Sequence, residues 1–383
     1  METQQQDVLS VKDLEVELDT EKGKLHALKG VSFEMRAKET LAIVGESGCG
    51  KSMTALSVMG LLPKPIASIS QGSITLAGHT LTQASKSELQ AMRGKQMSMI
   101  FQEPMTSLNP VMLCGKQIFE AITAHDKTIS KKAAAARALE MIKLVGIPAP
   151  EKVYRSYPHE LSGGMRQRIM IAMALATDPH LLICDEPTTA LDVTVQAQIL
   201  QLIDRMKTKL GTAVMLITHD MGVVSEMADW VLVMYAGHTV EYTKVDELFT
   251  RPLHPYTQGL IASIPKLDDA SDELYAIEGN VPMLSDMPKG CPFHPRCPFA
   301  REICKHRLPQ MEHVSRAASR AATPAAADAS DAAVTGTSAS ANADVNADVN
   351  ADAGAQSTPA TSAAASTEHK VACWKYTSAW EEE

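Results

Sequence analysis

A short apolar segment followed by a glycine-rich octet limits the possible folds of this chain more than any other feature. Leu41–Val44 is apolar throughout and predicts a buried strand. The octet Gly45-Glu-Ser-Gly-Cys-Gly-Lys-Ser52 follows directly, and a helical pattern begins at Lys51. This octet fits the pattern G-x-x-x-x-G-K-[ST] in the strand–loop–helix context that a phosphate loop requires. Similar apolar runs alternate with helical stretches further along the chain, which predicts an α/β fold with a mainly parallel core sheet.

The octet is also the first candidate binding site. Its glycines let backbone N–H groups wrap around phosphate oxygens, Lys51 would reach the terminal phosphates, and the Ser52 hydroxyl would bind Mg²⁺. We expect every member of the octet to contribute to nucleotide binding: Gly45, Glu46, Ser47, Gly48, Cys49, Gly50, Lys51 and Ser52. This pattern alone predicts a nucleoside triphosphate site and nothing finer.

Cys49 lies inside the octet, close to a helix N-terminus and to Lys51. Both neighbours favour a thiolate, so we expect the pKa of this thiol to be lowered. A redox switch would follow from a reactive thiolate. The plainer interpretation, which we favour, is a small residue that fits the turn.

A second glycine motif, Leu161-Ser-Gly-Gly-Met-Arg-Gln-Arg168, lies more than a hundred residues after the phosphate loop. Ser162, Gly163 and Gly164 would open a helix with uncapped backbone N–H groups. The positive end of the helix dipole points to the same place, so this helix start predicts an anion site.

The apolar run Leu181–Cys184 predicts another buried strand and ends in two carboxylates, Asp185 and Glu186. The strand end would bring Asp185 near the metal ion, while Glu186 would polarise an attacking water molecule. Acidic residues at a strand end are often only solvated caps. The presence of both glycine motifs in the same chain favours the catalytic interpretation of these two carboxylates.

Together these motifs resemble the complete set of an ABC-type ATPase, which implies a P-loop ATPase domain with a mainly parallel core sheet, an antiparallel β subdomain and a helical insert. The motifs that carry the likeness are Gly45–Ser52, Gln102, Leu161–Met165, Asp185–Glu186, Ala190-Leu-Asp192 and His219. The resemblance implies that such domains act as dimers. Each ATP is held between the phosphate loop of one chain and Ser162, Gly163 and Gly164 of the other.

The same resemblance implies roles for single residues. Gln102 would contact Mg²⁺ and the attacking water and report to a membrane subunit, and Asp185 would join Ser52 and Gln102 around Mg²⁺. Asp192 would bridge to the partner ATPase, and His219 would hold the γ-phosphate. One position departs from the family, which usually stacks adenine on an early aromatic residue; this chain offers Leu18 there.

Composition and motif positions predict the following organisation: an ATPase domain over 1–265 with a helical insert at about 104–165, a cysteine-rich extension over 266–315 and 368–383, and an insert over 316–367. The insert consists mostly of Ala, Ser, Thr and Asp. It has too few large apolar side chains to offset chain entropy, so we expect it to be disordered.

The extension contains Cys291, Cys297 and Cys304, and Cys373 follows after the insert. Four thiolates could hold a [4Fe–4S] cluster or a structural zinc ion. The spacings fit neither a C-x₂-C zinc pair nor the bacterial ferredoxin pattern, so spacing leaves zinc, iron–sulfur and free thiols open. The long insert does not prevent Cys373 from joining the site, because the cost of loop closure grows slowly with length.

The wording around these cysteines, together with His254-Pro-Tyr-Thr-Gln-Gly-Leu-Ile-Ala-Ser-Ile-Pro265, resembles the ATPases of oligopeptide and dipeptide importers, especially the D-type subunit. In that family the four cysteines are associated with an iron–sulfur cluster. The resemblance implies a second ATPase subunit in a heterodimer, two integral-membrane permease subunits and an extracytoplasmic solute-binding protein. An importer for nickel or glutathione is the nearest alternative, and a soluble ABC ATPase outside transport is a more distant one.

Charge and hydropathy exclude little else. A formal net charge of -9 gives no support to nucleic-acid binding. No apolar run reaches the roughly 18 to 20 residues that a membrane-spanning helix needs. The N-terminal residues lack the basic and apolar regions of a signal peptide. We therefore expect a peripheral protein at the cytoplasmic face of the cell membrane, where the seven cysteines are reduced, metal-bound or catalytic and not paired in disulfides.

Overall fold

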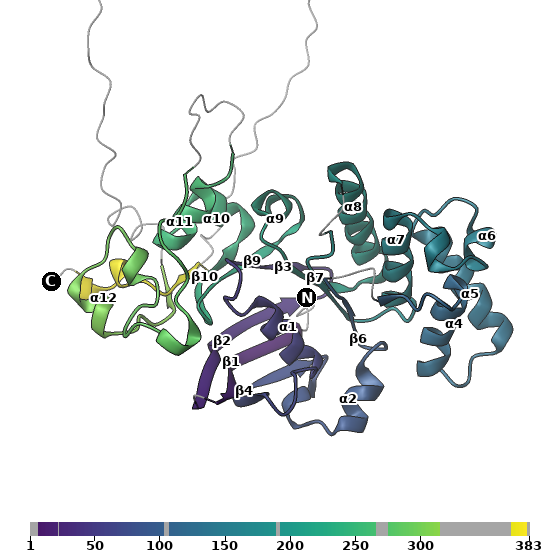
Figure 1. Cartoon of the computed structure of the whole chain (residues 1–383), viewed down its shortest axis with the longest axis horizontal. Coiled ribbons are helices and arrows are strands. Elements are labelled where there is room, and N and C mark those ends of the chain that lie inside the picture. Colours follow the sequence, from purple (N-terminus) through teal and green to yellow (C-terminus); the bar gives the residue numbers. More distant parts are fainter. Residues whose placement is uncertain are drawn as a thin grey trace, which may run out of the picture.

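The computed structural model describes residues 7–21, 23–102, 107–188, 192–265, 275–314 and 369–380. The expectations for Ala190 and for the insert at 316–367 lie outside these ranges. The described strands form two sheets, and a group of helices extends to one side of them (Figure 1).

The larger sheet has eight strands in the order β11-β12-β10-β9-β3-β8-β7-β6. Strands β9, β3, β8, β7 and β6 run parallel, and β10, β12 and β11 continue the sheet in antiparallel fashion. The parallel strands are β3 (Thr40–Val44), β6 (Met97–Ile100), β7 (Leu181–Asp185), β8 (Ala213–Ile217) and β9 (Trp230–Tyr235). The predicted parallel core sheet is therefore confirmed.

The smaller sheet is antiparallel, in the order β2-β1-β4-β5. Its strands are β1 (Asp7–Thr20), β2 (Gly23–Arg36), β4 (Ala67–Leu76) and β5 (His79–Thr80). Its apolar face encloses a core with one face of the large sheet and with α1 (Lys51–Met59). Leu41 and Ile43 of β3 point into this core, whereas Ala42 and Val44 point to the opposite face, as strand alternation requires.

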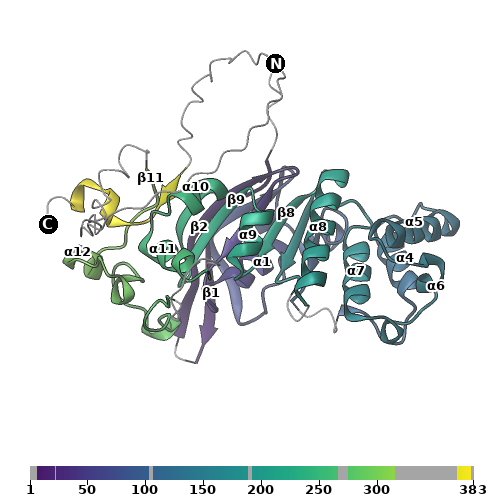
Figure 2. The same cartoon turned by 90° about the horizontal axis from the view of Figure 1, so that it is seen from above.

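Helices cover that opposite face. In Figure 2, α8 (Val193–Leu210) and α9 (Met221–Met227) lie across the large sheet, and α4 to α7 form a group beyond them. That group consists of α4 (Cys114–His125), α5 (Lys131–Leu144), α6 (Pro150–Tyr154) and α7 (Gly163–Ala174). The other helices are α2 (Lys86–Met92), α10 (Val245–Thr250), α11 (Pro255–Ala262) and α12 (Glu302–His306). No helix in the described ranges is both long and apolar enough to span a membrane.

After α11 the described chain contains only short elements. Beyond α12 come β11 (Glu312–His313) and, after residue 368, β12 (Lys370–Val371). Strand β12 pairs with β10 (His238–Lys244) on one side and with β11 on the other. The last described residues thus add a strand to the sheet that carries the phosphate loop.

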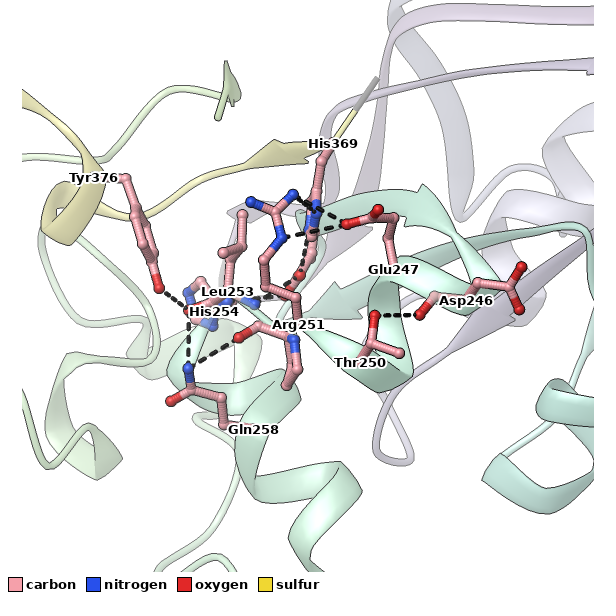
Figure 3. A network of polar contacts seen from close by, with 11 residues as sticks. Asp246, Glu247, Thr250, Arg251, Leu253, His254, Gln258, His369 and Tyr376 are labelled. Carbon is pink, nitrogen blue, oxygen red and sulfur yellow. Dashed lines mark hydrogen bonds and ion pairs between the residues drawn. The ribbon is translucent and has the colours of Figure 1, made fainter. Parts of the chain in front are cut away.

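A buried polar network holds this returning segment (Figure 3). The Glu241 carboxylate is fully buried and accepts hydrogen bonds from two backbone N–H groups of the loop before α11, at 2.8 and 2.9 Å. His369 Nε2 lies 2.7 Å from the same carboxylate, and His369 Nδ1 lies 3.2 Å from Nη2 of Arg251. Because a guanidinium only donates, Nδ1 is the acceptor and the proton of a neutral His369 is on Nε2. The Glu241 carboxylate therefore accepts a hydrogen bond from His369, which lies 128 residues further along the chain.

Candidate nucleotide site

The predicted phosphate loop connects the carboxyl end of β3 to α1. Gly45 has a φ of 148°, and a Cβ atom there would collide with the carbonyl oxygen of Met234 in the neighbouring strand. Gly50 is the N-cap of α1 in a left-handed conformation, and no side chain caps the helix. The first turn of α1 therefore presents backbone N–H groups to the loop, an arrangement suited to binding phosphate.

Lys51 is folded back onto this loop. Its Nζ donates to the carbonyl oxygens of Gly45 at 2.7 Å and Glu46 at 3.0 Å, and the side chain is largely buried. Carbonyl dipoles are weaker partners for an ammonium group than a phosphate anion is. The Lys51 ammonium group is thus held close to the loop by partners that an incoming phosphate could replace.

Ser52 and Asp185 place two oxygen ligands beside the loop. Ser52 Oγ donates to Asp185 Oδ1 at 3.2 Å, where β7 ends next to α1. Burial raises the pKa of Asp185, and the hydrogen bond from Ser52 partly opposes this. A hydroxyl and a carboxylate oxygen are ligands that Mg²⁺ prefers, and a bound dication would favour the ionised carboxylate.

The next residue, Glu186, has an unusual backbone conformation for a non-glycine residue, with a φ of 47°. Its carboxylate lies between the side chains of two other predicted site residues. Gln102 Nε2 donates to one oxygen at 2.8 Å, and His219 Nδ1 lies 3.2 Å from the other. The strained backbone and these two contacts hold the carboxylate beside the phosphate loop, where it could accept a proton from water.

Lys51, Ser52, Gln102, Glu186 and His219 line one open pocket of about 350 Å³, whereas Asp185 does not line it. The lining residues are Leu18, Ala27, Ser47, Gly48, Gly50, Lys51, Ser52, Met53, Gln102, Glu186, His219 and Leu284. Leu284 was not predicted. It lies in the segment after α11 and packs with Leu18 against the same apolar core. No local sequence signal marks it, because it reaches the pocket only through tertiary packing.

The second glycine motif is not part of this pocket in the described chain. Ser162 is the N-cap of α7, and its Oγ accepts a hydrogen bond from Met165 N at 3.3 Å. A Cβ atom at Gly163 would have no heavy atom within 4 Å. Asp192 caps α8 by accepting from Val195 N at 2.9 Å. Neither Asp192 nor residues 162–164 line the pocket around Lys51.

The expectation of a lowered pKa at Cys49 is wrong. The thiol is fully buried, and burial raises its pKa even though Lys51 acts in the opposite direction. Desolvation of a thiolate outweighs a single nearby ammonium group. Cys49 is therefore a small apolar residue of the loop, which agrees with the plainer interpretation.

All seven cysteines lie in the described ranges and are free thiols. Four of them gather beyond α11. Burial, together with the nearby thiols of Cys291, Cys297 and Cys304, raises the pKa of Cys373 to about 12. Cys291 N also donates to the carbonyl oxygen of Cys304 at 2.9 Å. No group of three or more His, Cys, Asp or Glu residues in the described ranges is arranged to hold a metal ion.

Comparison with known proteins identifies two family regions. Residues 28–189 match the sequence model of the family described as ABC transporter. Residues 240–304 match that of the oligopeptide/dipeptide transporter C-terminal region. The first region contains the phosphate loop and Glu186, and the second contains three of the four gathered cysteines.

Similar curated proteins include the oligopeptide transport ATP-binding protein OppD of Bacillus subtilis, 52% identical over 309 residues, which are 80% of this chain and 86% of the relative. The dipeptide transport ATP-binding protein DppD of Bacillus subtilis is 51% identical, over 79% of this chain and 90% of the relative. Among solved structures, the dimeric cassette MJ0796 bound to ADP and Pi is 25% identical with a TM-score of 0.55, and the alignment covers 62% of this chain and 98% of that chain. The structure of cbiO1 from Clostridium perfringens is 28% identical with a TM-score of 0.55, and the alignment covers 64% of this chain and 91% of that chain.

Proposed function

Because this chain belongs to the ABC transporter family, we propose that it is the ATP-hydrolysing subunit of an importer of dipeptides or oligopeptides. One observation carries the ATPase function: a single pocket joins a phosphate loop to a carboxylate held by an amide and an imidazole. The match of residues 240–304 to the oligopeptide/dipeptide transporter C-terminal region supports peptides as the cargo.

The polar residues of this pocket, together with Asp185 beside Ser52, have distinct chemical roles in hydrolysis. The amides of the loop and Lys51 bind the β- and γ-phosphates, and Ser52, Asp185 and Gln102 would hold Mg²⁺. When bound there, the ion would supply neutralisation of the phosphate charge. Glu186 accepts the proton of the attacking water, and His219 donates to the γ-phosphate. The Gln102 amide, 2.8 Å from the base, orients it toward that water.

The second half of each ATP site comes from another ATPase subunit. Ser162, Gly163 and Gly164 open α7 outside the pocket around Lys51, and a helix start of this kind, here with Ser162 as its N-cap, suits a partner's γ-phosphate. Asp192 contacts that partner. The subunit is therefore half of a dimer, and we propose a heterodimer with a related ATPase.

An apolar groove of about 820 Å³ beside Gln102 suits a permease subunit. Leu61 and Phe101 are large exposed apolar residues in its lining. Ser52, Gln102 and Asp185 line this groove. Ser52 and Gln102 also line the nucleotide pocket, and Asp185 accepts a hydrogen bond from Ser52. A movement of the groove would therefore displace side chains of the nucleotide site. Docking of one permease subunit here, and of the second on the partner ATPase, keeps the ATPase peripheral at the membrane surface.

Reconstituted transport tests the cargo. In vesicles that contain this chain, its co-purifying ATPase and the permease pair, with the solute-binding protein outside, ATP should drive uptake of labelled di- and oligopeptides. A matched preparation with ADP should give none. Uptake of nickel or glutathione in place of peptides would contradict the peptide function while leaving the ATPase function intact.

We also propose that Cys291, Cys297, Cys304 and Cys373 hold a [4Fe–4S] cluster. A structural zinc ion needs its sulfur ligands together around one atom at about 2.3 Å. In a cluster each thiolate binds a different iron atom, so the ligands stand farther apart. The proposal is supported by the proximity of the four thiols and by the match of residues 240–304, which contain three of them, to the oligopeptide/dipeptide transporter C-terminal region.

Metal analysis tests this proposal. Anaerobically purified protein should contain about four iron atoms per chain and show the visible charge-transfer absorption of a cluster. Cys373→Ser should lose both, whereas Cys114→Ser, at a buried free thiol in α4, should retain them. Stoichiometric zinc, or neither metal, would contradict the cluster.

A further inference from the structure

The cysteine-rich segment reaches the phosphate loop through one side chain. Arg296, between Cys291 and Cys297, forms two parallel hydrogen bonds with Glu46, the second residue of the loop. Nη1 lies 2.6 Å from Oε2, and Nη2 lies 3.0 Å from Oε1. Paired bonds of this kind between a guanidinium and a carboxylate are short, strong and directional. The two residues are 250 positions apart in the chain.

The guanidinium of Arg296 is held rigidly. All five of its N–H donors have acceptors: in addition to Glu46, Nε donates to the carbonyl oxygen of Glu278, Nη2 to that of Ile277 and Nη1 to the Tyr235 hydroxyl. Only 5% of the side chain is exposed. Its position is therefore set by the surrounding fold and does not depend on Glu46 alone.

An aromatic cluster joins this segment to the ATPase core behind the ion pair. Tyr235 ends β9, Tyr256 lies in α11, and Phe293 lies among the cysteines; their ring centroids are 4.7 to 5.4 Å apart. The Tyr256 hydroxyl accepts the backbone N–H of Glu46 at 2.8 Å. Residues outside the phosphate loop thus hold Glu46 by both its backbone N–H and its side chain.

The contacts of Arg296 and Tyr256 with Glu46 can remain when Lys51 leaves the loop carbonyl groups. Lys51 donates to the carbonyl oxygens of Gly45 and Glu46 and has to leave them to reach a phosphate. Arg296 and Tyr256 use other groups of Glu46, and neither contact competes with a phosphate. Arg296 also neutralises a carboxylate that would otherwise stand beside the phosphates as a like charge.

We propose that Arg296 is a positioning residue of the ATP site, through which the cysteine-rich segment sets the affinity of the phosphate loop for nucleotide. This inference rests on the proposed ATPase function. Arg296 does not touch the nucleotide. It holds Glu46 and cancels its charge, so that the loop amides face the phosphates before ATP arrives.

Arg296→Gln in the full-length chain tests the proposal. ATP should bind about tenfold more weakly, as expected for loss of a charge-assisted pair. In the assembled ATPase the KM for ATP should rise by a similar factor, with kcat nearly unchanged, because the reacting groups stay in place. Arg296→Lys should recover part of the affinity. The control Arg301→Gln removes a guanidinium of the same segment that lies over Trp380, and it should bind ATP like the wild type.

A double-mutant cycle separates positioning from general destabilisation. In a Glu46→Gln background the loop has no carboxylate to hold or neutralise, so Arg296→Gln should have little further effect on ATP affinity. The same tenfold loss in that background would overturn the proposal, as would wild-type affinity in the single variant. If Arg296→Gln fails to fold, the cycle is run with Arg296→Lys, which keeps the charge without the paired bonds. Failure of the wild type to bind ATP would instead contradict the ATPase function.

Discussion

Glu186→Gln should retain ATP binding and slow hydrolysis by about a hundred- to ten-thousandfold, the range of a lost general base. The glutamine side chain has nearly the same shape and can still contact Gln102 and His219. It cannot accept the proton of the attacking water. We propose that this chain works in an ATPase dimer that holds ATP between its subunits, so the variant should accumulate in an ATP-bound dimer. Phosphate release and size-exclusion chromatography with ATP measure the two effects.

Glu226→Gln is a matched control, because Glu226 is an exposed carboxylate on α9. It should hydrolyse ATP at the wild-type rate. Turnover by Glu186→Gln within a few-fold of wild type would remove Glu186 as the base. In that case the carboxylate held between Gln102 and His219 would have only a structural role.

Gly163→Ala should leave the isolated chain unimpaired and slow hydrolysis in the assembled enzyme. No heavy atom lies within 4 Å of the added methyl group, and alanine favours the start of α7 by up to about 1 kcal/mol. The isolated chain should therefore be as stable as wild type and bind ATP normally. In the dimer the methyl group would stand where the partner's γ-phosphate approaches the helix. Hydrolysis in the partner's site should fall roughly a hundredfold, as when an anion-binding donor is lost.

Lys51→Ala provides the mirror control, because Lys51 belongs to this chain's own phosphate loop. It should weaken ATP binding by the isolated chain, which Gly163→Ala should leave unchanged. Equilibrium binding of a fluorescent ATP analogue to each chain distinguishes the two. Weaker binding by isolated Gly163→Ala would show that the motif serves its own nucleotide and would refute the shared site.

Much of the fold can be predicted from the sequence, because strands buried on both faces are uninterrupted apolar runs. The predicted strands Leu41–Val44 and Leu181–Cys184 each differ from the observed β3 and β7 by one residue. The nucleotide pocket could be predicted as far as local motifs define it. Gln102, Glu186 and His219 are widely separated in sequence, and the parallel strands bring them to one edge of the sheet.

Long-range packing accounts for what could not be predicted. Leu284 and Arg296 reach the site from a segment without helical or strand periodicity, so no pattern marks their inward orientation. Cys49 was wrongly expected to be acidic because its burial depends on the whole surrounding core. Tyr256 lies in a motif that resembles the importer family, and its hydrogen bond to the Glu46 N–H could not be inferred from that likeness.

The place of β12 in the sheet has a consequence for how the protein is made on the ribosome. Glu241 is 128 residues ahead of its partner His369, and β11 has no described neighbour in the sheet except β12. At ribosomal rates of about 5 to 20 residues per second, roughly 6 to 26 seconds separate synthesis of the two residues. During that interval the nascent ATPase carries a carboxylate that cannot yet be buried with its imidazole partner. The sheet of the phosphate loop can be completed only after residues 370 and 371 of β12 have been made.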